Sequence, residues 1–524
     1  MDGLEEIVAL FVVVVAITAI AHRIGVLSPI LLVIVGIGLS FVPGLHHVQL
    51  DPQIVLVGIL PPLLYVAALE TSVPAFRYNL RPILLLAVGL VLFTAFAVGL
   101  SLTALLGLPF AICLALGAVV APPDAVSATA VARRIGLPRR MVTVLEGESL
   151  INDATALVLL RIATAVALGQ AVTGWSIAKE TAIAVLGGLL IGAVGAVVLA
   201  HVHKRITNPL LDNAVSLLAP YLVFLPAERI HASGVVAVVV TGLYLGHRLP
   251  TLMSAGSRLQ MEAFWRMVKF LLEGVVFLLV GLHMYGIFRD FSHGFSWGQG
   301  LVAVGVVVGV VIVARLAWLF PATYLARLVP AIRHRKERPS WAIPTVLGWA
   351  GMRGAVTLAA ALALPPVVPG GLTYPRPLFL VLAFAVIVAT LVIQGATLPG
   401  LARRLNVPVD EAKEDALVEA AVQHEASRAG RERLDAAADG APESVVERLR
   451  DVATSRSNLA WERLGRPDRE TPSLAYARLR REMLNAERDV FRSARDTGRI
   501  PEEVLRRAQR DMDLEESLLD RGDQ

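Results

Sequence analysis

The chain has 524 residues, of which 56% are hydrophobic and 17% charged, against about 25% charged residues in a typical soluble protein, so the composition excludes an ordinary soluble enzyme. Residues 402–524 hold 23 Lys/Arg and 27 Asp/Glu, whereas the first 401 residues hold only 25 and 16, which predicts a long membrane part followed by a short polar part. The net charge of +5 therefore reflects basic membrane loops, and it gives no support for nucleic-acid binding.

The apolar segments of the chain predict about thirteen membrane-spanning helices, because a helix needs roughly 20 apolar residues to cross a bilayer. In chain order, the predicted spans are 4–21, 27–44, 52–70, 82–106, 110–133, 142–169, 177–202, 210–228, 233–246, 259–288, 300–326, 341–365 and 377–401. Eighteen Lys and Arg residues lie in the loops after odd-numbered spans, and only three lie in the loops after even-numbered spans. Since short cytoplasmic loops carry excess Lys and Arg, this asymmetry predicts an N-terminus outside and a C-terminus in the cytoplasm.

Two of these spans are interrupted at positions that correspond in an inverted repeat. The span at 110–133 contains consecutive prolines, Pro122 and Pro123, which cannot donate backbone hydrogen bonds inside a helix. The span at 341–365, seven spans later, contains three glycines around Arg353. A repeat of about six helices would place the two spans in opposite directions, and broken helices at matching places indicate a transporter binding site.

Three ionisable residues, Asp124, Asp153 and Arg353, are predicted to lie near the middle of the membrane. The 1.5 Å rise per helical residue places them about 21, 16 and 18 Å into their spans, in a bilayer core about 30 Å thick. Charges at this depth are costly unless they are paired or hydrated, so each residue is a functional candidate. They come from three different spans, which indicates one shared site.

The span that contains Asp153 also supplies further polar groups. Ser149 lies one helical turn before Asp153, and Glu148 lies one turn before Asn152. Hydroxyl and carboxylate oxygens are ligands of hard cations, so this face could contribute to a cation site. Glu148, on the neighbouring face, can then pair with Arg353. A purely structural ion pair between Asp153 and Arg353 is the alternative.

Other polar residues in the spans are less informative. Glu70 is the last residue of the predicted span at 52–70. It is either a ligand for a cation that enters the site or a terminal acid that reaches toward water. Three charged residues are expected to form structural pairs with partners that the sequence does not identify: Arg161, Glu273 and Arg315. Three histidines at span ends lack metal-ligand spacing and are expected to lie at the membrane interface: His201, His203 and His231.

The polar part, residues 406–524, is predicted to form several amphipathic cytoplasmic helices. Leu479, Met483 and Val490 recur at helical spacing, and Gly440–Pro442 indicates a loop. Two interpretations of this tail remain open: a solvated charged bundle without a ligand, and a region for regulation or dimer contact.

Five short motifs follow one another along the membrane part. They are Leu60–Leu64 with two prolines, Asp124 after Pro122 and Pro123, Gly147–Ala154, Gly351–Val356 and Gln394–Leu398. In this order, over about residues 5–405, they resemble the sodium/hydrogen exchangers of the NhaP type, electroneutral members of the monovalent cation–proton antiporters. The segment Glu-Ser-Leu-Ile-Asn-Asp within the third motif is the most specific.

The resemblance implies roles for the site residues. Asp153 is expected to be the essential carboxylate that binds the ion and the proton, with Asn152 as its paired neighbour. Asp124 and Ser149 are expected to help coordinate the ion, and Glu70 to contribute through water.

The resemblance also implies an architecture. Glu148 is expected to pair with Arg353 and brace the core helices of each protomer. The family forms dimers, in which each protomer has a dimerisation domain and a six-helix core domain with two crossed, unwound helices. Pro123 departs from the Thr or Val that relatives often have before the Asp124-type position, so it affects the backbone ligands of the ion.

Together, the sequence and the resemblance predict a secondary antiporter, not an enzyme, that exchanges Na+ or Li+ for H+ at a 1:1 ratio and serves pH and cation homeostasis. The exchanger domain would be residues 1–405, in the cell membrane, with membrane lipid, the cation, H+ and a second copy of the chain as partners. No cofactor is expected, because the one cysteine, Cys113, has no partner and the P-loop pattern of ATP-driven pumps is absent. A K+/H+ antiporter with the same machinery and, from another class, a cation channel or uniporter are the alternatives.

Overall fold

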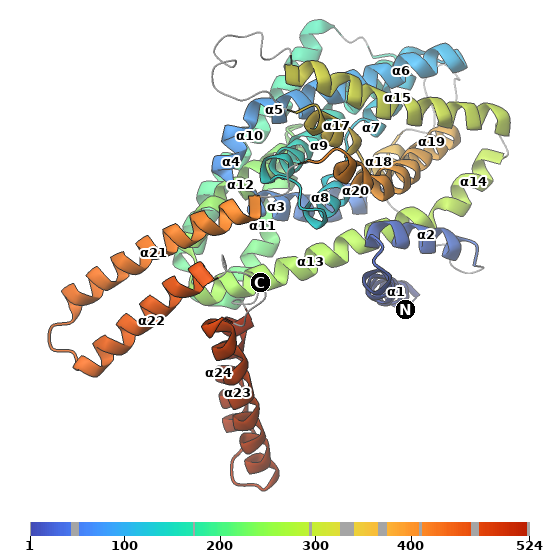
Figure 1. Cartoon of the computed structure of the whole chain (residues 1–524). Coiled ribbons are helices and arrows are strands. Elements are labelled where there is room, and N and C mark those ends of the chain that lie inside the picture. Colours follow the sequence, from blue (N-terminus) through green and yellow to red (C-terminus); the bar gives the residue numbers. More distant parts are fainter. Residues whose placement is uncertain are drawn as a thin grey trace. The chain divides into compact units, whose positions relative to one another are not determined.

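The computed structural model of the chain describes residues 2–42, 52–170, 173–292, 296–324, 340–364, 375–407, 411–462 and 471–520. The chain divides into two compact units, Met1–Val407 and Pro408–Gln524, and every regular element described in them is a helix (Figure 1).

The first unit contains the helices that the sequence predicts as membrane spans. In chain order they are α1 (Asp2–Ile24), α2 (Ser28–Ser40), η1 (Ile54–Ile59) with α3 (Leu60–Glu70), α5 (Leu80–Leu84) with η2 (Leu85–Leu90) and α6 (Val91–Leu106), α7 (Phe110–Val120) with α8 (Ala125–Arg134), α9 (Arg139–Ala167), α10 (Gly174–Arg205), α11 (Pro209–Arg229), α12 (Gly234–Leu252), α13 (Ala255–Leu282) with α14 (Met284–Ser292), α15 (Trp297–Tyr324), α17 (Ala342–Trp349) with α18 (Ala355–Leu362), and α19 (Arg376–Ala389) with η4 (Thr390–Gln394) and α20 (Gly395–Arg404). Eight described helical stretches are long and apolar enough to cross a membrane, and four shorter apolar helices and the pair α17 and α18 account for the remaining spans. The predicted all-α membrane architecture with about thirteen spans is confirmed.

Two predicted spans differ in detail from the structure. The span predicted at 233–246 continues as α12 to Leu252, because polar side chains at the end of a membrane helix can reach toward the interface without ending it. The segment predicted at 259–288 divides at His283 into α13 and α14. Parts of three predicted spans lie outside the described residues: 27–44, 300–326 and 341–365.

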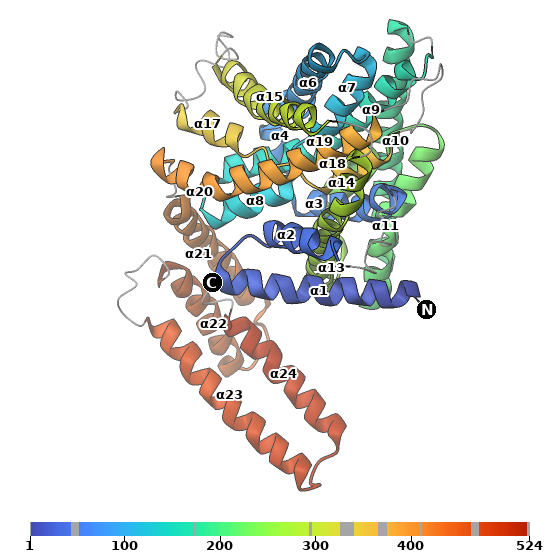
Figure 2. The same cartoon turned by 90° about the vertical axis from the view of Figure 1, so that its right-hand side faces the viewer.

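Small residues bring several of these helices close together. A Cβ atom on Gly36 of α2 would lie 2.5 Å from the carbonyl oxygen of Leu278 on α13, so only glycine permits this crossing. In the same way, a Cβ atom on Gly246 of α12 would lie 2.5 Å from the carbonyl oxygen of Leu69 on α3. Such close backbone approach is a common basis for helix association in membranes. Figure 2 shows α1 next to α2, and α13 packs against both.

The two interrupted helices meet at their breaks. Residues 121–124 separate α7 from α8, and residues 350–354 separate α17 from α18. The backbone N–H of Asp124 in the first break donates a hydrogen bond to the carbonyl oxygen of Met352 in the second, at 2.7 Å. The prediction of two crossed, interrupted helices is therefore confirmed.

The second unit consists of two helical hairpins. The helices α21 (Glu411–Ala437) and α22 (Glu443–Glu462) form the first hairpin, and α23 (Pro472–Asp496) and α24 (Glu502–Asp520) form the second (Figure 1). The turn predicted at Gly440–Pro442 joins α21 to α22, with a left-handed φ of +80° at Gly440.

The apolar residues that predict α23 do not form its buried face. Leu479, Met483 and Val490 are 55, 56 and 65% exposed, whereas Leu484 is buried. Charged pairs also join α23 to α24: the Arg480 guanidinium donates to both carboxylate oxygens of Glu515, at 2.6 and 2.8 Å, and this lowers the pKa of the Glu515 carboxyl. Helical spacing thus predicted the helix but not which of its faces is buried.

Candidate functional site

Asp124 begins the second half of the first interrupted helix. Pro122 and Pro123 cannot continue the hydrogen-bond ladder of α7, so the chain leaves the helix and restarts at α8. The Asp124 carboxylate caps α8: it accepts hydrogen bonds from the backbone N–H groups of Val126 (3.1 Å) and Ser127 (3.4 Å) and from the Ser127 hydroxyl (3.1 Å). An acidic residue is favourable at a helix N-terminus, where unpaired N–H groups carry partial positive charge.

Arg353 lies in the second break, between α17 and α18, and is fully buried. Its guanidinium donates to the carbonyl oxygens of Val120 and Ala121, each at 3.1 Å, and also to the carbonyl oxygen of Gly351. A cation stabilises the C-terminus of a helix, where carbonyl groups are unpaired. Its backbone N–H donates to the Thr390 hydroxyl at 3.0 Å. Arg353 therefore holds the crossing of the two interrupted helices together.

Glu148 pairs with Arg315 of α15. Arg315 donates from Nη1 to Oε1 at 2.5 Å and from Nη2 to Oε2 at 2.8 Å, and both residues are buried. Arg315 also donates from Nε to the carbonyl oxygen of Leu347, at the end of α17. The predicted Glu148–Arg353 ion pair is wrong. The Arg353 guanidinium donates to backbone carbonyl oxygens instead, and Glu148 binds a second buried arginine, Arg315. The alternative pair between Asp153 and Arg353 is not formed among the described residues either.

Asn152 and Asp153 lie on α9, beside the crossing. The Asn152 side chain donates from Nδ2 to the carbonyl oxygen of Pro123 at 2.8 Å, and its Oδ1 is buried without a hydrogen-bond partner among the described residues. Asp153 is 7% exposed, interacts electrostatically with Asp124, and receives no hydrogen bond from the residues that the structure describes. Ser149 is partly buried one turn before it. The structure thus brings together Asp124, Asn152 and Asp153, as the sequence predicts.

Glu70 does not join this group through a direct contact. Its side chain, at the end of α3, is 47% exposed and forms an ion pair with Lys269 of α13 (2.9 Å). Its expected contribution through water stays a prediction.

Sequence reasoning missed a buried pair between α10 and α11. His203 and Asp212 are both fully buried, and His203 Nδ1 lies 2.5 Å from Asp212 Oδ1. His203 lies in the last turn of α10, as expected for a span end, but it is buried within the protein, and its position at the membrane interface stays a prediction. The available signal was an acid and a histidine nine residues apart, on either side of a short loop between two helices.

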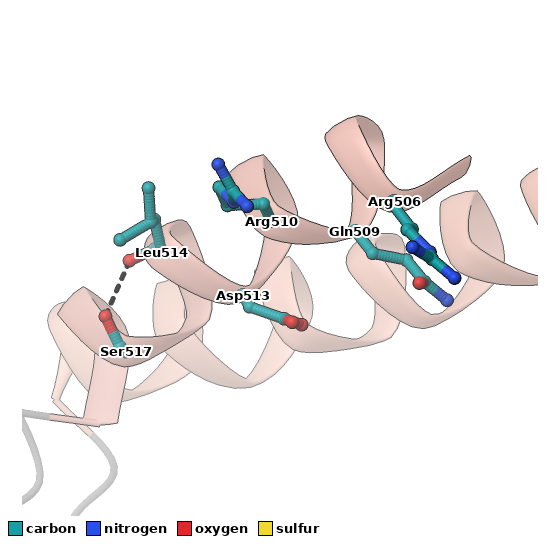
Figure 3. Close-up of a pocket in the computed structure, with 6 residues that line it drawn as sticks. All are labelled: Arg506, Gln509, Arg510, Asp513, Leu514 and Ser517. Atoms are coloured by element: carbon teal, nitrogen blue, oxygen red, sulfur yellow. Dashed lines mark hydrogen bonds between the residues drawn. The ribbon is translucent and has the colours of Figure 1, made fainter. Parts of the chain in front are cut away.

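Elsewhere, the described residues form no cluster of potential metal ligands. No group of three or more His, Cys, Asp or Glu side chains among them could hold a metal ion. The second unit has a shallow hollow along α24, in which the Ser517 hydroxyl donates to the Leu514 carbonyl oxygen at 2.8 Å (Figure 3). All the residues that line it come from this one helix, so it is a surface groove and not an enclosed site: Arg506, Gln509, Arg510, Asp513, Leu514 and Ser517.

The packing of Gly354 against Asp124 predicts that Gly354→Ala lowers the rate of the expected cation–proton exchange roughly 10- to 100-fold, as small displacements of a reacting group can do. A Cβ atom on Gly354 would lie 2.7 Å from the Asp124 carboxylate carbon and Oδ2, so it must displace the acid. Gly305→Ala on α15 is the matched control, because its Cβ atom would have no neighbour within 4 Å. Initial rates in vesicles, normalised to protein amount, measure both; equal rates would show that the Asp124 position is unimportant.

The family model "Sodium/hydrogen exchanger, transmembrane" matches residues 9–404. An uncharacterised Na+/H+ exchanger of Mycobacterium tuberculosis (strain H37Rv) is 37% identical over 534 residues, covering 99% of this chain and 97% of that protein. The Na+/H+ antiporter ApNhaP of Aphanothece halophytica is 31% identical over 433 residues, covering 82% of this chain and 78% of that one. The solved structure of the sodium proton antiporter MjNhaP1 from Methanocaldococcus jannaschii at pH 8 has the same fold, with a TM-score of 0.62 at 18% identity, over 77% of this chain and 99% of that chain.

Proposed function

Because the chain belongs to the sodium/hydrogen exchanger family, we propose that it exchanges Na+ or Li+ for H+ across the cell membrane at a ratio of 1:1. The observation that carries this proposal is the state of Asp153: a buried carboxylate without a hydrogen-bond donor among the described residues, next to a second carboxylate at a helix crossing. Such a carboxylate is costly when it is ionised and alone, and either a proton or a cation removes that cost. Proton and cation therefore compete for one group.

We assign different roles to the two carboxylates, Asp124 and Asp153. Three hydrogen bonds hold Asp124 at the N-terminus of α8, so we assign it to cation coordination. Nothing comparable holds Asp153, so we assign it the exchangeable proton. The Ser149 hydroxyl and the partnerless Asn152 Oδ1 supply further oxygen atoms, the ligand type that hard cations prefer. The Pro123 carbonyl already accepts from Asn152, so we do not assign it to the cation.

Exchange also requires that the site face each side of the membrane in turn. We propose that residues 1–405 move as an alternating-access exchanger domain within a homodimer, and that residues 406–524 form a cytoplasmic tail. The excess of basic residues after odd-numbered spans supports this orientation. Exchange of this kind would serve pH and cation homeostasis.

The experiment that tests this function uses everted membrane vesicles with an imposed pH gradient that a fluorescent dye reports. Addition of Na+ or Li+ should dissipate the gradient in vesicles that contain the protein and not in vesicles that lack it. A response to K+ that equals or exceeds the response to Na+ would support the K+/H+ alternative. Cation movement without proton movement would support the channel or uniporter alternative.

The amide of Asn152 predicts that exchange is electroneutral. An aspartate there could exchange a second proton in each cycle, whereas an amide neither binds nor releases a proton at physiological pH. Asp124, held by three hydrogen bonds, is assigned an unchanged protonation state through the cycle. One monovalent cation then replaces one proton on Asp153, so membrane voltage supplies no driving force, although an ion moved alone would experience about 2.3 kcal/mol per 100 mV. In proteoliposomes with a membrane potential clamped by valinomycin, net exchange should stop at the balance point where the cation concentration ratio across the membrane equals the proton concentration ratio. A balance point that moves with voltage would show a second titrating group.

A further inference from the structure

An open cavity of about 460 Å³ lies beside the half-helix that Asp124 caps. Its walls come from α1, α2, α8 and α13, and its polar lining residues are Thr18, His22, Ser28, Arg134 and Glu273. On α8 the lining residues are Val126, Ala130 and Arg134, spaced four residues apart, so one face of this helix borders the cavity. The cavity therefore follows α8 for about 12 Å, from two residues beyond Asp124 to the end of the helix.

Among the described residues, Glu273 of α13 is the carboxylate that lines this cavity. Its Oε1 is buried and has no hydrogen-bond partner among the described residues, and the same holds for the Thr18 hydroxyl oxygen across the cavity. The charges that act on Glu273 are, in order of strength, those of Lys269, Asp124 and Glu70, and the α8 face that lines the cavity begins two residues after Asp124. Buried acids that serve only structure normally have donors, which makes a partnerless one facing a cavity unusual.

The neighbouring charges do not neutralise Glu273 by direct contact. Lys269, one turn earlier on α13, forms its ion pair with Glu70 instead. Arg134 lies at the far end of the α8 face from Asp124, and His22 Nδ1 lies 3.2 Å from the Thr18 carbonyl oxygen. A carboxylate and a hydroxyl oxygen thus remain available in the lining of the cavity.

We propose that Glu273 is a second cation-binding carboxylate, which receives the monovalent cation from the cavity before it reaches Asp124 and Asp153. This inference rests on the proposed function and adds a residue to its pathway. Glu273 and Thr18 offer oxygen ligands, which suit a hard cation, and the repulsion between Glu273 and Asp124 is relieved when a cation lies between them. The sequence led us to expect a structural ion pair for Glu273. Because its Oε1 has no hydrogen-bond partner among the described residues, we assign it a ligand role instead.

The test compares Glu273→Gln with wild type in everted vesicles, at a range of added Na+ concentrations. Loss of one charged ligand should raise the apparent KM for Na+ roughly tenfold and change the maximal rate much less. Glu262→Gln is the matched control, because this acid lies on the same helix but is exposed and paired with Arg266. The control should keep the wild-type KM. An unchanged KM in Glu273→Gln, with wild type active, would overturn the inference alone, whereas an inactive wild type would overturn the proposed function itself.

A binding measurement separates a ligand from a structural acid. Purified Asp153→Asn protein should still be stabilised against heat by Na+, because the Glu273 site remains, and adding Glu273→Gln should remove that stabilisation. Equal stabilisation of the two proteins would contradict the inference. If Glu273→Gln does not fold, Glu273→Asp keeps the charge one methylene further from the cavity and should raise the KM by a smaller factor; a wild-type KM in that variant would also count against the inference.

Discussion

Asp153→Ala should reduce cation-dependent proton movement to the level of vesicles that lack the protein, while the protein remains folded and inserted. The variant removes the one carboxylate at the helix crossing that receives no hydrogen bond from the described residues, so no structural partner is left unpaired. The measurement is pH-gradient dissipation, normalised to the amount of protein in the membrane. Asp153→Asn, which keeps the shape of the side chain and removes its titration, should be equally inactive.

The control for this loss is an acid outside the site. Glu180 of α10 is exposed, and Glu180→Ala should retain the wild-type rate. Near-normal exchange by a well-expressed Asp153→Ala or Asp153→Asn protein would refute the assignment of the proton-binding group.

Arg315→Ala should cost folding yield as well as transport. It leaves the Glu148 carboxylate buried without its bidentate partner, and breaking a buried pair in this way typically costs about 3–5 kcal/mol. The double variant Glu148→Gln with Arg315→Met should recover part of the yield, because it removes both charges together. The measurement is the amount of monodisperse protein after extraction and its melting temperature.

Arg353 supplies the contrast that makes this prediction specific. Arg353→Ala frees the carbonyl oxygens of Val120 and Ala121 and does not touch the Glu148 ion pair. Glu148→Gln should therefore rescue Arg315→Ala but not Arg353→Ala. Rescue of the Arg353 variant and not the Arg315 variant would show that Glu148 is paired with Arg353 after all.

The parts of the fold that follow from local chemistry were predictable from the sequence. Pro122 and Pro123 cannot donate backbone hydrogen bonds in mid-span, and the glycines around Arg353 permit irregular backbone, so both interruptions could be placed. Counting residues placed Asp124, Asp153 and Arg353 at one depth, and in the structure Asp124 interacts electrostatically with Asp153 while Arg353 binds the end of α7.

The partners of the buried charges could not be predicted in the same way. Depth along a membrane helix follows from counting residues, but rotation about the helix axis does not, because lipid and protein interior are both apolar and leave no polar face to read. Arg315 and Arg353 both lie deep in their spans, and only packing decides which one meets Glu148. The same reason explains why the buried His203–Asp212 pair was missed.

The most direct test of coupled exchange uses purified protein in proteoliposomes with equal Na+ on both sides and an imposed pH gradient. We expect radioactive Na+ to accumulate on the acidic side against its own concentration gradient, for as long as the pH gradient lasts and with the voltage clamped at zero. Asp153→Asn protein should show no accumulation under the same conditions. Sodium that only equilibrates across the membrane in wild-type proteoliposomes, without accumulation and without proton movement, would contradict coupled exchange and indicate a uniporter.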